Sequence, residues 1–443
     1  MYGLAGRELR FALIISSVHF SQHFYYRVLP PLIPILAVAL EYPLWQLGLL
    51  ISLYSFGMGL AQAPLGVISD RIDRAYLLPS GIALTGAAYV VFAAAPVLGA
   101  GIASIAVRGF SFDGGFLIMA VSMVGVGIGL SVVHPVGYPM ISDNTTSTNK
   151  GKVLGLFGAS SKFGDAATPA IIAGLILVLS WEHIILAFGL AGIAYGIALF
   201  LVFREGRYET VPTGQRNGDL ETDSGPDEPN DRRSYLYPMV AVYCFFITTA
   251  IAASGLNTFL PAFVVDIYAY SISIGTLAIG EESVANLYFS LLLISGAATQ
   301  LVLGGLTDQF DPRVILLGCM GVAAVGMAIL AMVSLHPLLL IVVIVALGAG
   351  LYGVNPARDT LISDLSPPER EGRTFGYVFT AVTLTAAPLP TLIGYVLDTV
   401  GMREGYLLLA IGPILAAGCI AVLYSDRIYR PTAERTAPSP GGD

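Results

Sequence analysis

Twelve apolar runs, each long enough to cross a bilayer as an α-helix, constrain the fold of this chain most strongly. A span needs about 20 apolar residues, because the hydrocarbon core is about 30 Å thick and an α-helix rises about 1.5 Å per residue. Charged residues make up only 12% of the chain, about half the share of a soluble domain. The sequence therefore predicts an all-α polytopic membrane protein with twelve transmembrane helices. The expected spans are residues 11–38, 44–68, 75–96, 115–142, 152–179, 184–203, 235–265, 284–307, 313–333, 337–363, 373–397 and 404–424.

One long polar stretch, residues 204–234, divides these runs into two groups of six. It is rich in Asp, Glu, Arg, Gly and Pro, a composition typical of linkers. The predicted organisation is an N-terminal six-helix half (1–203), a cytoplasmic linker (204–234), a C-terminal six-helix half (235–424) and a cytoplasmic tail (425–443).

The basic residues orient this map in the membrane. With the N-terminus in the cytoplasm, 17 of the 22 Lys and Arg residues fall on the cytoplasmic side. Such an excess is the usual orientation signal of a membrane protein. The sequence thus predicts a multi-pass protein of the plasma membrane with both termini in the cytoplasm. The net charge of −8 gives no indication of a nucleic-acid partner.

The two halves contain an internal repeat. Residues 127–143 (GIGLSVVHPVGYPMISD) match residues 348–364 (GAGLYGVNPARDTLISD) at a fixed offset of 221. A second match pairs residues 66–73 (GVISDRID) with 304–311 (GGLTDQFD) at an offset of 238. Repeated halves are typical of secondary transporters, whose substrate sites lie near the bilayer midplane between the repeats.

The segment from Gly66 to Arg74, which contains Asp70 and Arg71, resembles the signature loop of the major facilitator superfamily between spans two and three. A weaker echo, with Gly304 and Asp308, falls between spans eight and nine. The resemblance implies the twelve-span fold of that superfamily, transport by alternating access, and a gating role for this loop. The residues predicted to gate are Asp70, Arg71, Arg74 and Asp308.

A narrower resemblance is to the fosmidomycin-resistance type of transporter. It is carried by His19 with Gln22 and His23, by His134-Pro135, and by the segment from Phe157 to Pro169. The resemblance implies proton-driven export, and fosmidomycin is itself a phosphonate anion.

Five charged residues fall well inside predicted spans: Arg27, Lys162, Asp165, Arg358 and Asp359. A charge at the bilayer centre costs at least about 2.5–3.5 kcal/mol, so such residues usually face a cavity or a partner. Lys162 and Asp165 lie three residues apart on one helix and are expected to pair with each other. Arg358 and Asp359 are adjacent and should point about 100° apart. We therefore expect Arg358 to bind an anion and Asp359 to pair with a neighbouring helix.

Three histidines accompany these charges. His19 and His23 recur with Arg27 at intervals of four, so the three share one helix face. This stripe either lines the central cavity, where a histidine could carry a proton, or makes hydrogen bonds between helices. His134 and Asn355 are repeat partners, each followed by proline, and are predicted to lie at symmetric helix bends. These bends either place a polar side chain in the cavity or act only as gating kinks.

The prediction is a secondary active transporter of a small, anionic organic solute or drug, working as a monomer by proton-coupled export. An uptake symporter or uniporter on the same fold is the alternative, and a transporter-like membrane sensor is a more distant one. No nucleophile–base set and no metal-ligand spacing is present, so neither an enzyme nor a cofactor or metal is expected. The predicted proton carriers are Asp165, His19 and His23. The predicted substrate-binding residues are His19, His23, Arg27, His134, Lys162, Asn355 and Arg358.

Overall fold

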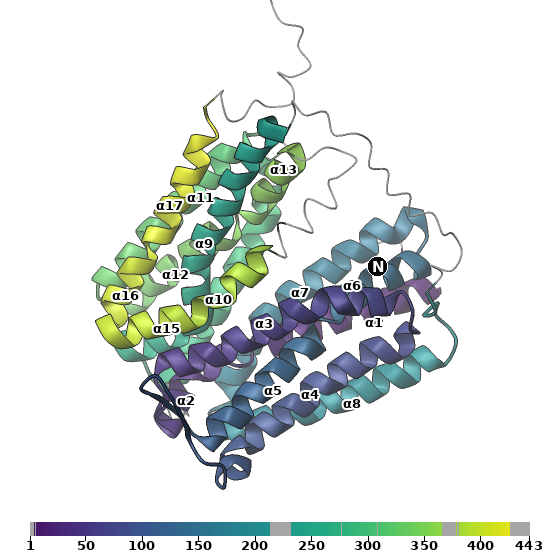
Figure 1. The fold of residues 1–443 in the computed structure, drawn as a ribbon. Helices are drawn as coiled ribbons and strands as arrows, with labels where there is room; N and C mark the ends of the chain where they lie inside the picture. Colours follow the sequence, from purple (N-terminus) through teal and green to yellow (C-terminus); the bar gives the residue numbers. More distant parts are fainter. Residues whose placement is uncertain are drawn as a thin grey trace, which may run out of the picture. The chain divides into compact units, whose positions relative to one another are not determined.

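The computed structural model describes residue 4 and residues 6–212, 232–275, 277–307, 309–365, 378 and 381–425. These residues are almost entirely helical (Figure 1). The first part contains α1 (Gly6–Tyr26), the short 3-10 helix η1 (Pro30–Leu32), α2 (Ile33–Leu40), α3 (Leu44–Ser69), α4 (Arg74–Gly99), α5 (Gly114–Leu130), α6 (Val133–Asn144), α7 (Ser147–Leu175) and α8 (Trp181–Arg204). The second part contains α9 (Arg232–Ile267), α10 (Glu281–Leu306), α11 (Pro312–Met332), α12 (Pro337–Tyr352), α13 (Asn355–Leu365), α15 (Leu389–Val400), α16 (Met402–Leu409) and α17 (Ile411–Val422).

The predicted membrane fold is confirmed. Among the described residues, 11 helical segments are long and apolar enough to cross a membrane. Their bounds follow the predicted spans closely: the expected span 75–96, for example, is α4. The remaining predicted span, 152–179, corresponds to α7, which has 29 residues and carries Lys162 and Asp165 along its length.

Two helix pairs are broken at positions related by the repeat. The break between α5 and α6 lies just before His134 and Pro135, and the break between α12 and α13 lies just before Asn355 and Pro356. Proline lacks an N–H and its ring clashes with the carbonyl four residues earlier, which here falls at the end of the preceding helix. The predicted symmetric bends are therefore present.

Glycines allow α4 and α8 to pack with their backbones in contact. A Cβ atom on Gly86 would lie 2.5 Å from the carbonyl oxygen of Gly189, and one on Gly196 would lie 2.8 Å from Cβ of Ala83. Small residues at such crossings let membrane helices approach closely and gain van der Waals contact. The spacing of α4 and α8 is thus set by residues that cannot be enlarged without moving a helix.

The described residues form two compact units. The first consists of those between Met1 and Asp219 together with Thr258–Ser290 and Ala387–Thr399. The second consists of those in Leu220–Asn257, Leu291–Ala386 and Val400–Asp443. The predicted division into two halves at the linker stays a prediction, as do the plasma-membrane location and the cytoplasmic termini. Residues 213–231 of the linker and 426–443 of the tail lie outside the described residues.

Within the first unit, α15 holds the start of α3. The carboxylate of Asp398 accepts hydrogen bonds from the backbone N–H groups of Leu44 and Trp45, at 3.1 and 2.9 Å. One turn further along α3, a Cβ on Gly48 would lie 2.2 Å from the carbonyl oxygen of Pro390. The first N–H groups of a helix have no partner within it, so a carboxylate placed there satisfies them and interacts favourably with the helix dipole.

Two short hairpins occur in loops where no strand was expected. In the first, β1 (Ile105–Val107) pairs with β2 (Phe110–Phe112) in antiparallel register. Its two turn residues, Arg108 and Gly109, both have positive φ, at 49° and 87°, which is the requirement of a two-residue type I′ turn. The second hairpin joins β3 (Ile272–Ile274) to β4 (Leu277–Ile279). Three-residue strands are too short to leave a periodic signal in the sequence.

Candidate functional site

A buried ion-pair cluster joins α1 and α7. The carboxylate of Asp165 lies 2.8 Å from Nε of Arg27 through one oxygen and 3.2 Å from Nδ1 of His23 through the other. Arg27 and Asp165 are each only 6% exposed. Gly164 makes this approach possible, because a Cβ there would lie 2.4 Å from the carbonyl oxygen of Phe20 on α1. The cluster thus depends on a glycine that brings the two helices into backbone contact.

The predicted pairing of Lys162 with Asp165 is wrong. In the described structure Asp165 pairs with Arg27 and lies beside His23, both on the neighbouring helix segment. An arginine side chain offers several donors in a rigid fork, whereas the ammonium of a lysine three residues away on the same helix must bend to reach a buried carboxylate. Lys162 is partly buried and remains close enough to act on the charge of Asp165.

Arg27 stands just beyond the end of α1, where the helix gives way to η1. Its backbone N–H still donates to the carbonyls of His23 and Phe24, at 3.2 and 3.1 Å. The guanidinium lies 5.0 Å from the centre of the Tyr26 ring, within cation–π range. Sequence reasoning did not identify Tyr26, although an aromatic residue beside an intramembrane arginine is a usable signal.

His19 is held in one tautomer by its contacts. Its Nδ1 lies 2.7 Å from the backbone carbonyl oxygen of Phe157, and its ring stacks on that of Phe157 with centroids 3.9 Å apart. A carbonyl can only accept, so Nδ1 carries the hydrogen and the Nε2 of neutral His19 is an acceptor. This Nε2 is buried and has no hydrogen-bond partner among the described residues.

The other two histidines lie edge-on to His19. Ring centroids are 4.9 Å apart for His19 and His23, and 5.1 Å apart for His19 and His134. His134 in turn stacks on Tyr138 at 5.8 Å. The fold therefore brings together the predicted residues of α1, α6 and α7 in a single cluster. Phe157 and Tyr138 are members that the sequence did not single out as site residues.

In the second unit, Arg358 and Asp359 pair with each other, against expectation. Nε and Nη2 of Arg358 lie 2.9 and 2.8 Å from the same carboxylate oxygen of Asp359. Helix geometry separates their Cβ directions, but the long arginine side chain folds back and lies 4.6 Å from the ring of Phe246. Asn355, partly buried, begins α13 in this unit.

A polar pair that was not predicted also occurs in the second unit. The hydroxyl of Tyr352, at the end of α12, donates to the side-chain oxygen of Asn257 on α9. Neither residue carries a formal charge, and the sequence search relied on intramembrane charges, so the pair went unnoticed.

The predicted gating residues differ sharply in burial. Asp70 and Arg71 are exposed, whereas Arg74 is 4% exposed and its Nη1 lies 2.6 Å from the carboxylate of Asp143 at the end of α6. Asp308 lies outside the described residues.

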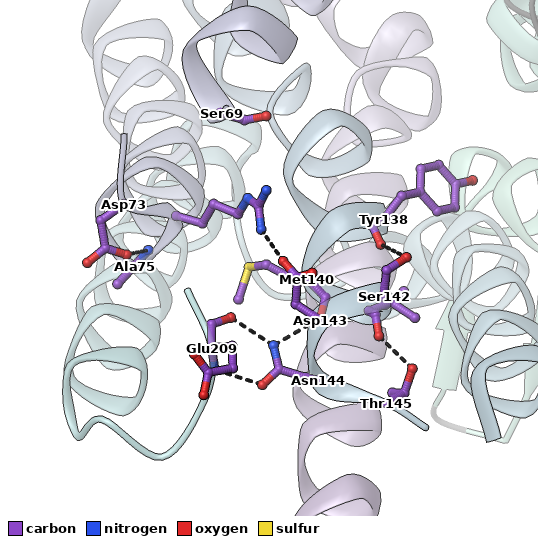
Figure 2. A network of polar contacts seen from close by, with 12 residues as sticks. Ser69, Asp73, Ala75, Tyr138, Met140, Ser142, Asp143, Asn144, Thr145 and Glu209 are labelled. Carbon is purple, nitrogen blue, oxygen red and sulfur yellow. Dashed lines mark hydrogen bonds and ion pairs between the residues drawn. The ribbon is translucent and has the colours of Figure 1, made fainter. Parts of the chain in front are cut away.

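Asn144, next to Asp143, ties the segment after α8 to α6. It donates to the carbonyls of Met140 and Glu209, at 2.9 and 2.8 Å, and accepts from the N–H of Glu209 at 2.8 Å (Figure 2). The Arg74 backbone N–H donates to the carbonyl of Thr210 at 3.0 Å. The loop after α3 is therefore bound to the ends of α6 and α8 through Arg74.

Among the described residues, no group of three or more His, Cys, Asp or Glu side chains lies close enough to hold a metal ion. The polar chemistry of the site in the first unit is therefore that of a guanidinium, a carboxylate, an ammonium and imidazoles.

Comparison with known proteins identifies the family. A family model described as Major Facilitator Superfamily matches residues 15–281 and 279–443. The chain is 21% identical over 411 residues to the hexuronate transporter of Bacillus subtilis (strain 168), covering 89% of each chain. It is 27% identical over 159 residues to the probable L-galactonate transporter of Escherichia coli (strain K12), which is 36% of this chain and 31% of that relative.

A solved structure shows the same fold. The bacterial homolog of the human lysosomal transporter Spinster, in an inward-facing and occupied conformation, aligns with a TM-score of 0.73 and 15% identity over 99% of this chain and 100% of that one. The chain belongs to the major facilitator superfamily and is a membrane transporter of that type.

Proposed function

We propose that the chain is a proton-coupled transporter of a small organic anion that works by alternating access. The observation that supports this is the buried carboxylate of Asp165 between Arg27 and His23. Ionisable residues inside a membrane protein are costly and are characteristic of substrate pathways and proton relays. Family membership accounts for transport, and the chemistry of the cluster is the basis for proposing an anion and a proton.

Arg27 is the proposed anion-binding group. A guanidinium can hold a carboxylate through two parallel hydrogen bonds, and Asp165 occupies one of its donors. A substrate carboxylate therefore competes with Asp165 for the same cation. A displaced Asp165 would be a buried charge that has lost its guanidinium partner, which costs several kcal/mol. Taking up a proton removes that cost, so anion binding and proton binding favour each other and the two move in the same direction.

Two buried acceptors favour a substrate that also carries hydroxyl groups. His19 presents Nε2, and Gln22 presents its side-chain oxygen because its amide N–H donates to the carbonyl of Leu130 at 2.9 Å. Neither atom has a hydrogen-bond partner among the described residues. Gln22 and His19 lie on α1, about one and two turns before Arg27. Two relatives are named as transporters of L-galactonate and of hexuronate, which combine a carboxylate with several hydroxyls. We propose a hydroxylated carboxylate as the substrate class.

Export driven by inward proton flow is the second candidate, favoured by the resemblance carried by His19 and His134-Pro135. It requires the proton and the substrate to compete for the site, whereas the pairing of Arg27 with Asp165 links them. The two candidates therefore predict opposite effects of the same pH gradient.

The test uses purified protein in liposomes with radiolabelled L-galactonate and D-glucuronate. An acidic exterior is expected to drive accumulation of at least one of the two inside the vesicles, and the uncharged methyl ester of glucuronate should not accumulate. If an acidic exterior instead expels preloaded anion, export is correct and co-transport is wrong. If neither anion responds to the gradient, proton coupling of these substrates is wrong.

The matched variants are Asp165→Asn and Asp165→Glu. The asparagine keeps the size but cannot be protonated, so downhill exchange of labelled anion should persist while the response to the pH gradient is lost. The glutamate keeps the titratable group and should retain part of the response. A gradient response in Asp165→Asn equal to that of the wild type would remove Asp165 from the coupling mechanism.

A further inference from the structure

An apolar groove lies between the first turns of α4 and the last turns of α8. It has a volume of about 440 Å³ and is lined by Tyr76, Pro79 and Ala83 from α4 and by Gly196, Ile197 and Phe200 from α8, among others. Tyr76 and Ile197 are about half exposed, so the groove opens to the surroundings of the protein. On helices that cross a membrane, such a face is in contact with lipid.

The floor of the groove is a close contact between α4 and α8. Gly196 lies against α4 so closely that a Cβ atom there would be 2.9 Å from the carbonyl oxygen of Pro79 and 2.8 Å from Cβ of Ala83. The hollow exists because Gly196 and Ala83 have small side chains. The helix contact beneath them prevents the hollow from closing. The groove is therefore a built feature of the α4–α8 contact.

A cation without an acidic partner stands at one end of this groove. Arg204, the last residue of α8, is exposed, and its guanidinium lies 5.8 Å from the ring of Tyr76 and 5.5 Å from that of Phe200. Among the described residues no carboxylate lies within 4 Å of it. Arg207 provides the contrast, because its Nε lies 3.0 Å from the carboxylate of Glu205.

A second groove lies between α1 and the end of α8, and one of its two arginines is paired with a carboxylate. Its volume is about 360 Å³, and its lining includes Arg10 and Arg207 but also Glu205. The carboxylate neutralises Arg207 and would repel a phosphate. An anionic headgroup is therefore favoured at Arg204 over Arg207.

We propose that the groove between α4 and α8 binds an anionic glycerophospholipid, with one acyl chain along Tyr76 and Phe200 and the headgroup phosphate on Arg204. The apolar lining suits the chain, and a guanidinium can hold a phosphate through two hydrogen bonds. Basic pockets between membrane helices are known to hold lipid headgroups in this way. The end of α8 lies on the side of the membrane to which the sequence assigns most basic residues.

The experiment is lipid binding by the purified full-length chain, measured by native mass spectrometry with phosphatidylglycerol and with phosphatidylcholine. The wild type should bind phosphatidylglycerol in preference. Arg204→Gln should weaken that binding about fivefold and leave phosphatidylcholine unchanged, since one basic residue near an anionic lipid contributes about 1 kcal/mol. Arg207→Gln, three residues away, is the matched control and should bind phosphatidylglycerol as the wild type does.

Two further measurements test where the lipid binds and whether the bound phosphate belongs to a lipid or to a soluble compound. Ser80→Phe, which fills the groove from an exposed lining position, should reduce binding of both lipids, with thermal unfolding used to verify that the variant is folded. Glycerol 1-phosphate in excess should not displace phosphatidylglycerol, because it lacks the acyl chain. Equal binding by wild type and Arg204→Gln, an equal loss in Arg207→Gln, or displacement by glycerol 1-phosphate would each overturn the proposal.

Discussion

The arginines of the two halves of the chain form their ion pairs in different ways. In the N-terminal half, Arg27 pairs with Asp165 and Arg74 with Asp143, partners that lie on other helices. In the described part of the C-terminal half, Arg358 pairs with the adjacent Asp359, and Arg313 pairs with Asp311 two residues before it.

The repeat explains why Arg313 pairs locally whereas Arg74 does not. At the offset of 238 residues, Asp73 corresponds to Asp311, and both carboxylates cap the helix that follows by accepting a backbone N–H. The position of Arg74 is taken by Pro312, so the arginine of the second loop comes one residue later, at Arg313. From there it folds back on the cap and donates to the carbonyl of Leu423 at 2.8 Å.

The two halves therefore differ in whether their ion pairs connect helices. A pair between helices fixes two elements at once, and both pairs here have a buried arginine, so breaking one leaves a charge in or beside an apolar interior. A pair between sequence neighbours fixes only one short segment. Its charges are partly hydrated, so it contributes little to the free energy of unfolding. The N-terminal half should therefore be the more sensitive to loss of an arginine.

The largest effect is expected for Arg27→Ala. It leaves Asp165 buried without its guanidinium, and breaking a buried pair costs about 3–5 kcal/mol. The stability measured by thermal unfolding should fall, and liposome transport should be lost because the anion-binding group is gone. Arg27→Lys, which keeps the charge, should recover part of both. Transport by Arg27→Ala at the wild-type rate would remove Arg27 from the site.

Arg74→Ala should have the next largest effect on stability. Asp143 is about a fifth exposed, so leaving it unpaired should cost less than the roughly 3–5 kcal/mol of a fully buried pair. Arg313→Ala is the matched control in the other half and should cost about 1 kcal/mol or less. Thermal unfolding of the two variants in the same detergent gives the comparison. Equal losses in the two variants would contradict the contrast between the halves.

Arg358→Ala is expected to separate transport from stability. Its pair with Asp359 is local and the carboxylate is 44% exposed, so the unfolding free energy should change by less than about 1 kcal/mol. Transport should nevertheless be lost if the predicted role of Arg358 as an anion-binding residue is correct. Normal membrane insertion with normal transport would exclude Arg358 from the site.

The smallest effect concerns Asp311, which lies between α10 and α11 outside the spans. Burial alone would raise the pKa of its carboxyl, but hydrogen bonds from Arg313 lower the pKa below its ordinary value. A group whose pKa is lowered on folding stabilises the protein above its unfolded pKa and loses that contribution as the pH falls through the folded pKa. Asp311→Asn, which can still cap α11, should be less stable than the wild type at neutral pH by under about 1 kcal/mol.

Thermal unfolding at several pH values measures this difference. The gap between wild type and Asp311→Asn should shrink as the pH falls below about 4. A gap that grows on acidification would reverse the sign of the proposed charge interaction.

The span map was predictable because lipid imposes a simple rule on the chain. Every backbone polar group in the bilayer must be satisfied internally, so each apolar run of sufficient length becomes a helix. The bends before Pro135 and Pro356 were predictable too, because proline removes a helix hydrogen bond and clashes with the carbonyl four residues earlier. The three-residue strands of the first hairpin depend on two positive φ angles, at Arg108 and Gly109, and the sequence pattern does not reveal them.

Side-chain partners were less predictable. Lys162 and Asp165 have the spacing of a helical ion pair, yet Asp165 pairs with Arg27 and His23 across a helix contact. The sequence did contain a sign of close helix packing, because Gly164 allows α1 to approach α7. No sequence rule states which helix will pack there. Asp143 likewise lies within the repeated Ile-Ser-Asp motif, but its partner Arg74 is 69 residues away.

By itself the sequence determined the membrane fold, the repeat, the helix bends and the short list of intramembrane charges, because hydropathy, proline and charge act locally along the chain. Only the tertiary structure decided which charges meet. Ion pairs form between atoms a few ångströms apart, and glycine contacts such as Gly164 against Phe20 set those distances. The residues of the site on α1 and α7 were thus identified from the sequence, whereas the contacts between them were determined by helix packing.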